Sequence, residues 1–356
     1  MFTKTSSISA VRAAAGPFSM ALAVALLLAA SAASSAAAPI SDGGFVYTAN
    51  EGGNSVSRID LSTGEVLTVP TTVTPHNLQI TPDGKTLLAV GTEAMMMDGN
   101  DGGHDGEAKG MLLVFSADDL SAGPFAEIEV GGHPAHVIAD RGGKRAFVTN
   151  SEDGTVTVVD LVTASVVGTI PTGRFPHGMR LNPAGDEILV ANVESGSVSV
   201  LDPVQLRQVA EIAVGNAPVQ VGFTPDGKWA FVSLRDDDSV AAIDPEARSV
   251  VERIAVGNGP IQVYATPDSA FVLVANQGTE EEPRNTVSVI EVASSKVVQT
   301  IRTGAGAHGV AVNDNGQLAF ITNILDGTVS VIDIESWNVI ATVPVGAGPN
   351  GVTFGR

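Results

Sequence analysis

The chain has 356 residues and a formal net charge of −20 at pH 7, with 39 acidic against 19 basic residues and no cysteine. The lack of cysteine excludes disulfides, thiolate chemistry, cysteine-ligated zinc and cysteine-linked haem. The acidic balance excludes the basic footprint on which nucleic-acid binding depends, and a low aromatic content with 39 Gly and 19 Pro indicates short strands joined by tight turns.

The first 38 residues have the pattern of a signal peptide. Lys4 and Arg12 precede the apolar run 20–30, and small residues follow it as far as Ala38. The apolar run is too short to cross a bilayer of about 30 Å as a helix. We therefore expect residues 1–38 to be removed by cleavage between residues 32 and 38, and residues 39–356 to be periplasmic or secreted with no membrane span.

Residues 39–356 repeat a unit of 42 residues. Proline recurs with this period, and Ala307 and Pro349 are again 42 residues apart. The prolines in phase are Pro134, Pro176, Pro218 and Pro260. Two longer intervals indicate insertions at 92–110 and 277–285. One clean copy, 145–186, contains four alternating apolar and polar stretches separated by turn residues, which predicts four short antiparallel strands per unit.

Seven such units without helical periodicity predict an all-β fold, a single seven-bladed β-propeller of four-stranded antiparallel blades. The repeating part then starts on a second strand, 45–48, and ends on a first strand, 351–354. Pairing of these two terminal strands would complete one blade and leave no open sheet edge. A parallel β-solenoid is the structural alternative, although its coils are usually shorter than this unit.

Short segments in the second and third strands of several units carry a family resemblance. Examples are Val148–Asn150 with Val158–Asp160, and Ile321–Asn323 with Ile332–Asp333. These segments resemble the YVTN β-propeller repeat, and over residues 45–356 the chain is similar to bacterial, exported YncE-like propellers. The resemblance implies the propeller fold. It implies no single function, because the family includes surface-layer and periplasmic binding proteins, and this chain departs from the pattern where Leu234 replaces the repeat asparagine.

Histidines gather at one place in the repeat. The residue after the proline position is His76, His177 or His308 in three units, and His136 lies one residue further on in a fourth. Because first strands line the axis, these side chains should approach one mouth of the central channel. Neutral imidazoles suit Zn, Cu or Ni, so we predict a divalent metal ion there. The alternative is that each ring packs between blades and hydrogen-bonds backbone, with blades too far apart for shared ligation at about 2 Å.

Both insertions are expected on the same face as the histidines. The larger contains a second candidate cation site, formed by Asp98, Asp101, His104, Asp105 and Glu107. Their spacing does not match an EF-hand, and a solvated loop is the alternative. The smaller contains Glu280 to Glu282, which we interpret as a charged loop. Repeated asparagines on this face, such as Asn150 and Asn192, are expected to have a structural, turn-capping role.

The sequence contains no nucleophile elbow, phosphate loop or H-E-x-x-H motif, so it assigns no catalytic or cofactor-binding residue. We interpret the chain as a binding scaffold that presents an acidic loop face with a His-lined channel mouth to a protein or small ligand. A metal-dependent hydrolase or lyase is the first alternative, and a redox partner protein is the second. The opposite face, joined by short Pro-Asp-Gly turns, is expected to carry no function.

Overall fold

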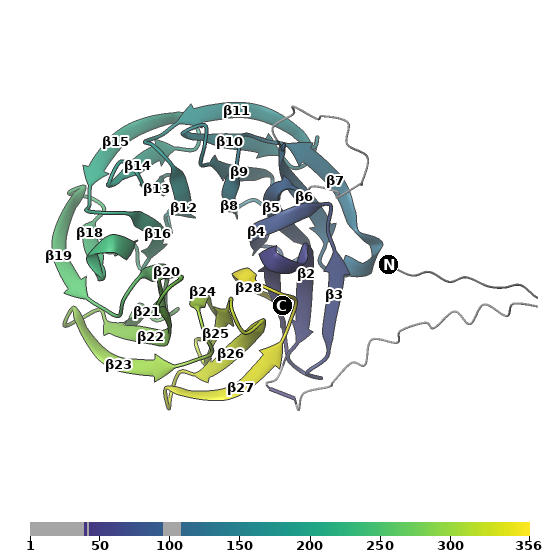
Figure 1. Ribbon diagram of the computed structural model, residues 1–356. Coiled ribbons are helices and arrows are strands. Elements are labelled where there is room, and N and C mark those ends of the chain that lie inside the picture. Colours follow the sequence, from purple (N-terminus) through teal and green to yellow (C-terminus); the bar gives the residue numbers. More distant parts are fainter. Residues whose placement is uncertain (1–38, 41–42, 95–107) are drawn as a thin grey trace, which may run out of the picture. The chain divides into compact units, whose positions relative to one another are not determined.

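The computed structural model describes residues 39–40, 43–94 and 108–356. All described residues belong to one compact unit, Ser35–Arg356. In this unit, seven four-stranded antiparallel sheets stand around a common centre (Figure 1), which confirms the seven-bladed propeller expected from the repeat. No helix in the described ranges is long and apolar enough to cross a membrane.

Each blade contributes one strand to each of four concentric positions, from the centre outward. The innermost strands are β28 (Pro349–Gly355), β4 (Val73–Ile80), β8 (Pro134–Ala139), β12 (Pro176–Leu181), β16 (Pro218–Phe223), β20 (Pro260–Ala265) and β24 (Ala307–Val312). The second strands are β1 (Phe45–Asn50), β5 (Thr86–Glu93), β9 (Arg145–Asn150), β13 (Ile188–Asn192), β17 (Ala230–Leu234), β21 (Phe271–Gly278) and β25 (Leu318–Asn323).

The two outer positions complete the blades. The third strands are β2 (Ser55–Asp60), β6 (Gly110–Ser116), β10 (Thr155–Asp160), β14 (Ser197–Asp202), β18 (Ser239–Asp244), β22 (Pro283–Glu291) and β26 (Thr328–Asp333). The fourth are β3 (Val66–Pro70), β7 (Pro124–Glu129), β11 (Ser165–Pro171), β15 (Arg207–Ala213), β19 (Ser249–Ala255), β23 (Lys296–Arg302) and β27 (Asn338–Pro344). The short 3-10 helices are η1 (Glu51–Gly53), η2 (Leu120–Ala122) and η3 (Arg235–Asp237).

The two ends of the propeller close one blade, as predicted. β28 pairs antiparallel with β1, and Tyr47 lies opposite Thr353 in this register. The smaller insertion extends the β21–β22 hairpin, with Gly278 opposite Pro283. The larger insertion leaves β5 and β6 paired as far as Thr92 and Gly110.

The core lies between neighbouring blades. One cluster joins Tyr47 and Val56 of the first blade to Leu87, Leu113 and Phe115 of the next, and each of these side chains is buried. Full burial of such a side chain stabilises the fold by about 1.5–3 kcal/mol. Because the second and third strands pack on both faces, the blades are held in fixed positions relative to one another, and so are the inner strands that line the centre.

The repeated asparagines have the structural role expected of them, but with different partners. The side-chain NH2 of Asn150 donates to the hydroxyls of Thr155 and Thr157 on the adjacent strand, at 2.9 and 2.8 Å. Its side-chain oxygen accepts from the backbone N–H of Gly131 in the preceding loop, at 3.1 Å. The asparagine therefore ties two strands and a loop together, whereas the sequence pattern predicts that it caps its own turn.

Candidate metal centre

A backbone irregularity at the start of the inner strands directs histidines toward the axis. The pairing of β4, β8 and β12 with their neighbours shifts register between Pro75 and Asn77, between Pro134 and Val137, and between Pro176 and Met179. A bulge at this point places two consecutive side chains on the same side of the strand. Consequently the first position after the proline, in β4 and β12, and the second position, in β8, both reach the channel.

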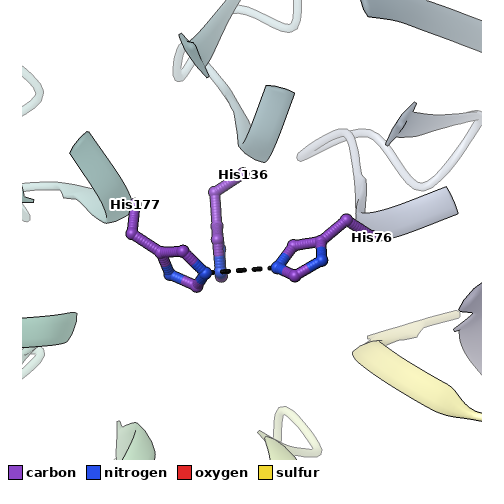
Figure 2. A group of neighbouring side chains, drawn as sticks. All are labelled: His76, His136 and His177. Atoms are coloured by element: carbon purple, nitrogen blue, oxygen red, sulfur yellow. Dashed lines mark hydrogen bonds between the residues drawn. The ribbon is translucent and has the colours of Figure 1, made fainter. Parts of the chain in front are cut away.

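Three histidines from three consecutive blades meet at this mouth. Figure 2 shows the rings of His76, His136 and His177 pointing toward one another from β4, β8 and β12. Nε2 of His76 lies 3.2 Å from Nε2 of His177, and one ring nitrogen from each of the three lies within 4.8 Å of the others. The rings of His136 and His177 have centroids 4.9 Å apart. Blades two apart thus bring imidazoles into contact, which removes the distance objection raised from the sequence.

The spacing is close to that of a tetrahedral metal site. Nitrogens bound at about 2.0–2.1 Å to a tetrahedral zinc ion are about 3.3 Å from one another. The Nε2 atoms of His76 and His177 already have this separation. No spacing in the group exceeds 4.8 Å, so the ligand nitrogens have to approach one another by at most about 1.5 Å, which is within the reach of a side-chain rotation. The three histidines can therefore hold one divalent ion and leave a further coordination position toward the channel.

Backbone and carboxylate groups orient two of the three rings. Nδ1 of His177 lies 3.3 Å from the carbonyl oxygen of Val219 on the next blade, so the ring donates there and directs the Nε2 lone pair to the centre. Nδ1 of His76 lies 3.3 Å from Oε1 of Glu51 in η1. Asn350 holds this carboxylate by donating to Glu51 Oε2 at 2.5 Å. A carboxylate behind a histidine fixes the ring and raises its basicity toward a metal.

His136 is oriented differently. Its Nε2 is buried and has no hydrogen-bond partner in the described part of the chain. On the other side of the ring, the side-chain NH2 of Gln220 lies 3.5 Å from Nδ1, at the limit for a hydrogen bond. A donor at Nδ1 favours the tautomer with its proton on Nε2, so ligation through Nε2 requires the proton to transfer to Nδ1 and the Gln220 amide to turn.

The surrounding protein keeps the imidazoles of His136, which is buried, and His177, which is half-buried, in the neutral form. Burial, reinforced by the charges of His177 and His76, holds the pKa of His136 well below its ordinary value of 6.5. Burial and the charge of His76 likewise hold the pKa of His177 well below 6.5. Burial raises the pKa of Glu51, but hydrogen bonds from His76 and Asn350 outweigh it and lower the pKa to about 2. At neutral pH the site therefore offers the neutral imidazoles of His136 and His177 and one carboxylate anion, Glu51.

The fourth predicted ligand lies apart from this group. His308, at the start of β24, places Nδ1 3.3 Å from the carbonyl oxygen of Asn350, so its ring contacts the backbone of the next blade. Burial, together with the charge of His76, lowers the pKa of His308 to about 4. The alternative interpretation of the histidines, packing with a backbone hydrogen bond, describes His308, whereas His177 combines that hydrogen bond with a place in the group of three.

The candidate cation site in the larger insertion lies outside the described residues. It consists of Asp98, Asp101, His104, Asp105 and Glu107. The smaller insertion borders a surface groove with a volume of about 890 Å³, which Arg235, Arg284 and the three glutamates 280–282 help to line. The groove also includes Ile261 of the inner strand β20, which occupies the position in its unit that His177 occupies in β12. It therefore opens on the same face as the histidines.

Comparisons with known proteins agree with this architecture. A family model described as YNCE-like beta-propeller matches residues 135–234 and 230–356, which together span more than half of the chain. The chain belongs to the YNCE-like β-propeller family. No curated protein matches it in sequence. Membership of the family shows the fold of this YNCE-like propeller but not its activity, which has to be inferred from its own residues.

Solved structures similar to this YNCE-like propeller include two bacterial proteins. One is Kuenenia stuttgartiensis hydrazine synthase, with a TM-score of 0.67 and 22% identity, over 78% of this chain and 89% of that chain. The other is a functionally unknown protein from Desulfotomaculum acetoxidans DSM 771, with a TM-score of 0.69 and 17% identity, over 88% of this chain and 99% of that chain. At these identities the likeness shows the fold alone.

Two groups at the site were missed from the sequence, Glu51 and Gln220. Glu51 directly follows the repeat asparagine Asn50, where other units have Ser151 or Ile324. Gln220 occupies the same position of its unit as His136. Comparing the units of this YNCE-like propeller position by position would have singled out Glu51. Only the structure could place Gln220 behind the His136 ring.

Proposed function

We propose that this protein is an exported binding scaffold that holds one divalent transition-metal ion at the mouth of its channel. The ligands are His76, His136 and His177. The observation that carries the proposal is the convergence of one ring nitrogen from each histidine within 4.8 Å, with Nε2 of His136 buried and lacking a partner among the described residues. A buried imidazole nitrogen without a partner is unfavourable unless something fills its hydrogen-bonding or coordinating capacity.

The chemistry of the donor set supports zinc, copper or nickel. Neutral imidazoles suit these ions, and an all-nitrogen set disfavours calcium and magnesium, which take oxygen ligands. The carboxylate of Glu51 behind His76 and the Val219 carbonyl behind His177 supply the outer contacts that ligating histidines usually have.

The bound ion would give the scaffold its ligand-binding position. Three protein ligands leave tetrahedral coordination incomplete, so a donor atom of a small ligand or a partner side chain can complete it. The groove beside 277–285 lies on the same face and carries the Glu280 to Glu282 carboxylates, which favour a partner with basic side chains there.

We also infer that the protein works outside the cytoplasm, in the periplasm or the medium. The support is the N-terminal sequence, with two cations before the apolar run 20–30 and small residues after it. Fractionation of cells that express the full chain should recover a shortened protein outside the cytoplasm, with its new N-terminus between residues 33 and 39. Recovery of the intact chain in the cytoplasm would contradict this.

Metal content tests the proposal directly. Purified protein is stripped with a chelator, incubated separately with zinc, copper or nickel, desalted and analysed for metal. We expect about one equivalent for at least one ion, and less than about a tenth of an equivalent after the double substitution His76→Ala with His177→Ala. His133→Ala is the matched control, because His133 is exposed and lies outside the group of three. Less than a tenth of an equivalent in the unaltered protein, for all three ions, would overturn the proposal.

A metal-dependent hydrolase or lyase is the second candidate. It is favoured by the incomplete coordination of a three-histidine site, since an ion in that setting can lower the pKa of a bound water or polarise a carbonyl. The metal-loaded protein should then turn over an activated ester or phosphate ester, and the double histidine variant should not. Equal turnover by both proteins would exclude this candidate and leave the metal-binding proposal intact.

A further inference from the structure

A second group of polar side chains lies toward the other end of the inner strands. Arg180, near the end of β12, borders one cavity of about 160 Å³ and another of about 170 Å³. The first of these shares Gln79, Tyr264 and Thr353 with a cavity of about 450 Å³ that is also lined by the turn 81–84. Because the two cavities share these residues, the cavity beside the Arg180 guanidinium adjoins one that lies at the face opposite the histidines.

The charge of Arg180 is not balanced by a carboxylate. The only hydrogen bond of its side chain within the described ranges is from Nη1 to the carbonyl oxygen of Met179, at 3.2 Å, and no described carboxylate lies within 4.0 Å of the guanidinium. Its guanidinium carbon lies 5.6 Å from the centre of the Tyr264 ring. Part of the side chain remains accessible in the channel, but the surrounding protein desolvates the guanidinium and lowers its pKa. An arginine stays charged in such a place, and most of its donors remain free.

A second side chain in the same cavity also lacks a partner. Gln262 on β20 is 2% exposed, and its side-chain NH2 is buried with no acceptor among the residues that the structure describes. Its side-chain oxygen accepts from the backbone N–H of Val310 at 3.5 Å, which leaves the NH2 group toward the remaining space. Tyr264 lies two residues further along the same strand, and so on the same side of it. Three groups that can donate hydrogen bonds thus come from two strands.

The carboxylate nearest to this cavity is already paired. Asp314 contributes to the cavity wall, but its side chain is 63% exposed and lies 3.1 Å from Nε of Arg356. It therefore belongs to the surface rim. Among the described residues, the cavity wall therefore has one cation without a carboxylate partner and one amide NH2 without an acceptor, beside the Tyr264 phenol, in a protein whose formal net charge is −20.

We propose that this cavity is a binding site for a small oxyanion, held by the guanidinium of Arg180 with donors from Gln262 and Tyr264. The planar fork of arginine matches carboxylate, sulfate and phosphate groups, which accept two of its N–H donors at once. A volume of about 160 Å³ admits an ion of that size and excludes a folded segment of a partner protein. The site is separate from the histidine group and does not depend on a bound metal.

Calorimetric titration of the full chain tests this site. The protein is kept metal-free with a chelator, and sodium sulfate, phosphate and propionate are each added at constant ionic strength, with chloride as the reference ion. We expect at least one oxyanion to bind at a 1:1 ratio with a Kd below about 1 mM. Arg180→Met, which keeps the volume of the side-chain stem, should weaken that binding at least about 30-fold, and Arg180→Lys about tenfold. Arg302→Met on the outer strand β23 should leave it unchanged.

A thermal unfolding series separates binding from a purely structural role. Sulfate stabilises many proteins without binding a site, so the response of Arg180→Met measures that general effect. We expect the unaltered protein to gain more stability from the oxyanion than Arg180→Met does, and Arg180→Met to be no less stable without it, since an unbalanced charge has been removed. No saturable binding of any oxyanion, equal binding by Arg180→Met, or a Tm of Arg180→Met lowered to the same extent with and without the oxyanion would each overturn the proposal.

Discussion

The two ends of the same seven inner strands have opposite chemistry. At the start of the strands, His76, His136 and His177 come from consecutive blades and direct one ring nitrogen each toward a common point, and the pKa values of His136 and His177 are held well below 6.5. Toward their ends, Arg180 stands without a carboxylate partner near Gln262 and Tyr264. The repeat supplies equivalent positions around the axis, and the chemistry depends on which blades carry which side chain. In our proposals, a set of like residues on adjacent blades forms a cation site, and a single cation among neutral donors forms an anion site.

Removing one histidine of the three should have the largest effect. We expect His177→Ala to weaken zinc binding by more than about 100-fold, because loss of a ligand should exceed the 10- to 100-fold effect of losing an outer contact. His308→Ala should weaken it less than about tenfold, since His308 contacts the Asn350 carbonyl and lies outside the group of three. Competition titrations with a chromogenic chelator measure both values. Equal losses for the two variants would make His308 a ligand and change the site.

Acidification should destabilise the metal-free protein at the histidine end. The folded-state pKa of His308 is about 4, below the ordinary value of 6.5, so the unfolded chain binds a proton first. Stability is therefore lost as pH falls below 6.5, and His308 alone accounts for on the order of 2 kcal/mol between pH 7 and pH 5. His308→Gln should lose that much less in urea unfolding over this interval. Parallel pH profiles for the two proteins would contradict the assignment of His308 as a buried neutral imidazole.

Replacing Gln220, which lies behind the His136 ring, should strengthen zinc binding at the three histidines. In Gln220→Glu, one carboxylate oxygen can keep the Val221 N–H, which Gln220 accepts at 2.9 Å, and the other can accept the proton on Nδ1 of His136. Nε2 would then carry its lone pair toward the metal, and we expect zinc affinity to rise about tenfold. Gln262→Glu is the matched control, because it adds the same charge at the equivalent position of the next blade. An equal rise in both variants would assign the effect to net charge.

Coupling between the two ends should be the smallest effect. The charge of Arg180 is among those that lower the pKa of His136, so it also opposes a bound cation. An oxyanion on Arg180 should relieve this opposition and tighten zinc binding about two- to fivefold, and zinc should tighten sulfate binding by the same factor. Zinc titrations with and without saturating sulfate measure the coupling. The two Kd values should coincide in Arg180→Met, and coincidence in the unaltered protein would show that the ends act independently.

Much of the histidine end could be predicted from the repeat. The 42-residue phase placed His76 and His177 at equivalent positions and His136 one residue later, and the direction of the inner strands placed all three at one mouth. Their actual contact depends on the bulge at the start of each inner strand, which has no signature in a pattern of apolar and polar residues. The sequence therefore predicted the shared mouth but left open the alternative that blades two apart are too distant, and the 3.2 Å contact between Nε2 of His76 and Nε2 of His177 removes that alternative.

The proposed oxyanion site could not be predicted from the sequence. It depends on Arg180 having no carboxylate partner and on the Gln262 NH2 having no acceptor among the described residues. Arg180 and Tyr264 are 84 residues apart, and no motif distinguishes Arg180 from an arginine that reaches solvent or a carboxylate. Whether a buried donor has an acceptor depends on rotamers from several strands. The face opposite the histidines was expected to carry no function because its turns are short. The length of a turn indicates what lies at the rim of the channel, but not which side chains line its interior.

The metal centre is tested most directly by diffraction from crystals of the protein soaked with zinc, with data collected on both sides of the zinc absorption edge. We predict one anomalous peak between the three imidazoles, with His76, His136 and His177 each contributing a nitrogen at about 2.0–2.1 Å. His308 should keep its contact with the Asn350 carbonyl. The absence of a peak at that mouth, or a peak confined to the acidic insertion 92–110, would contradict the account.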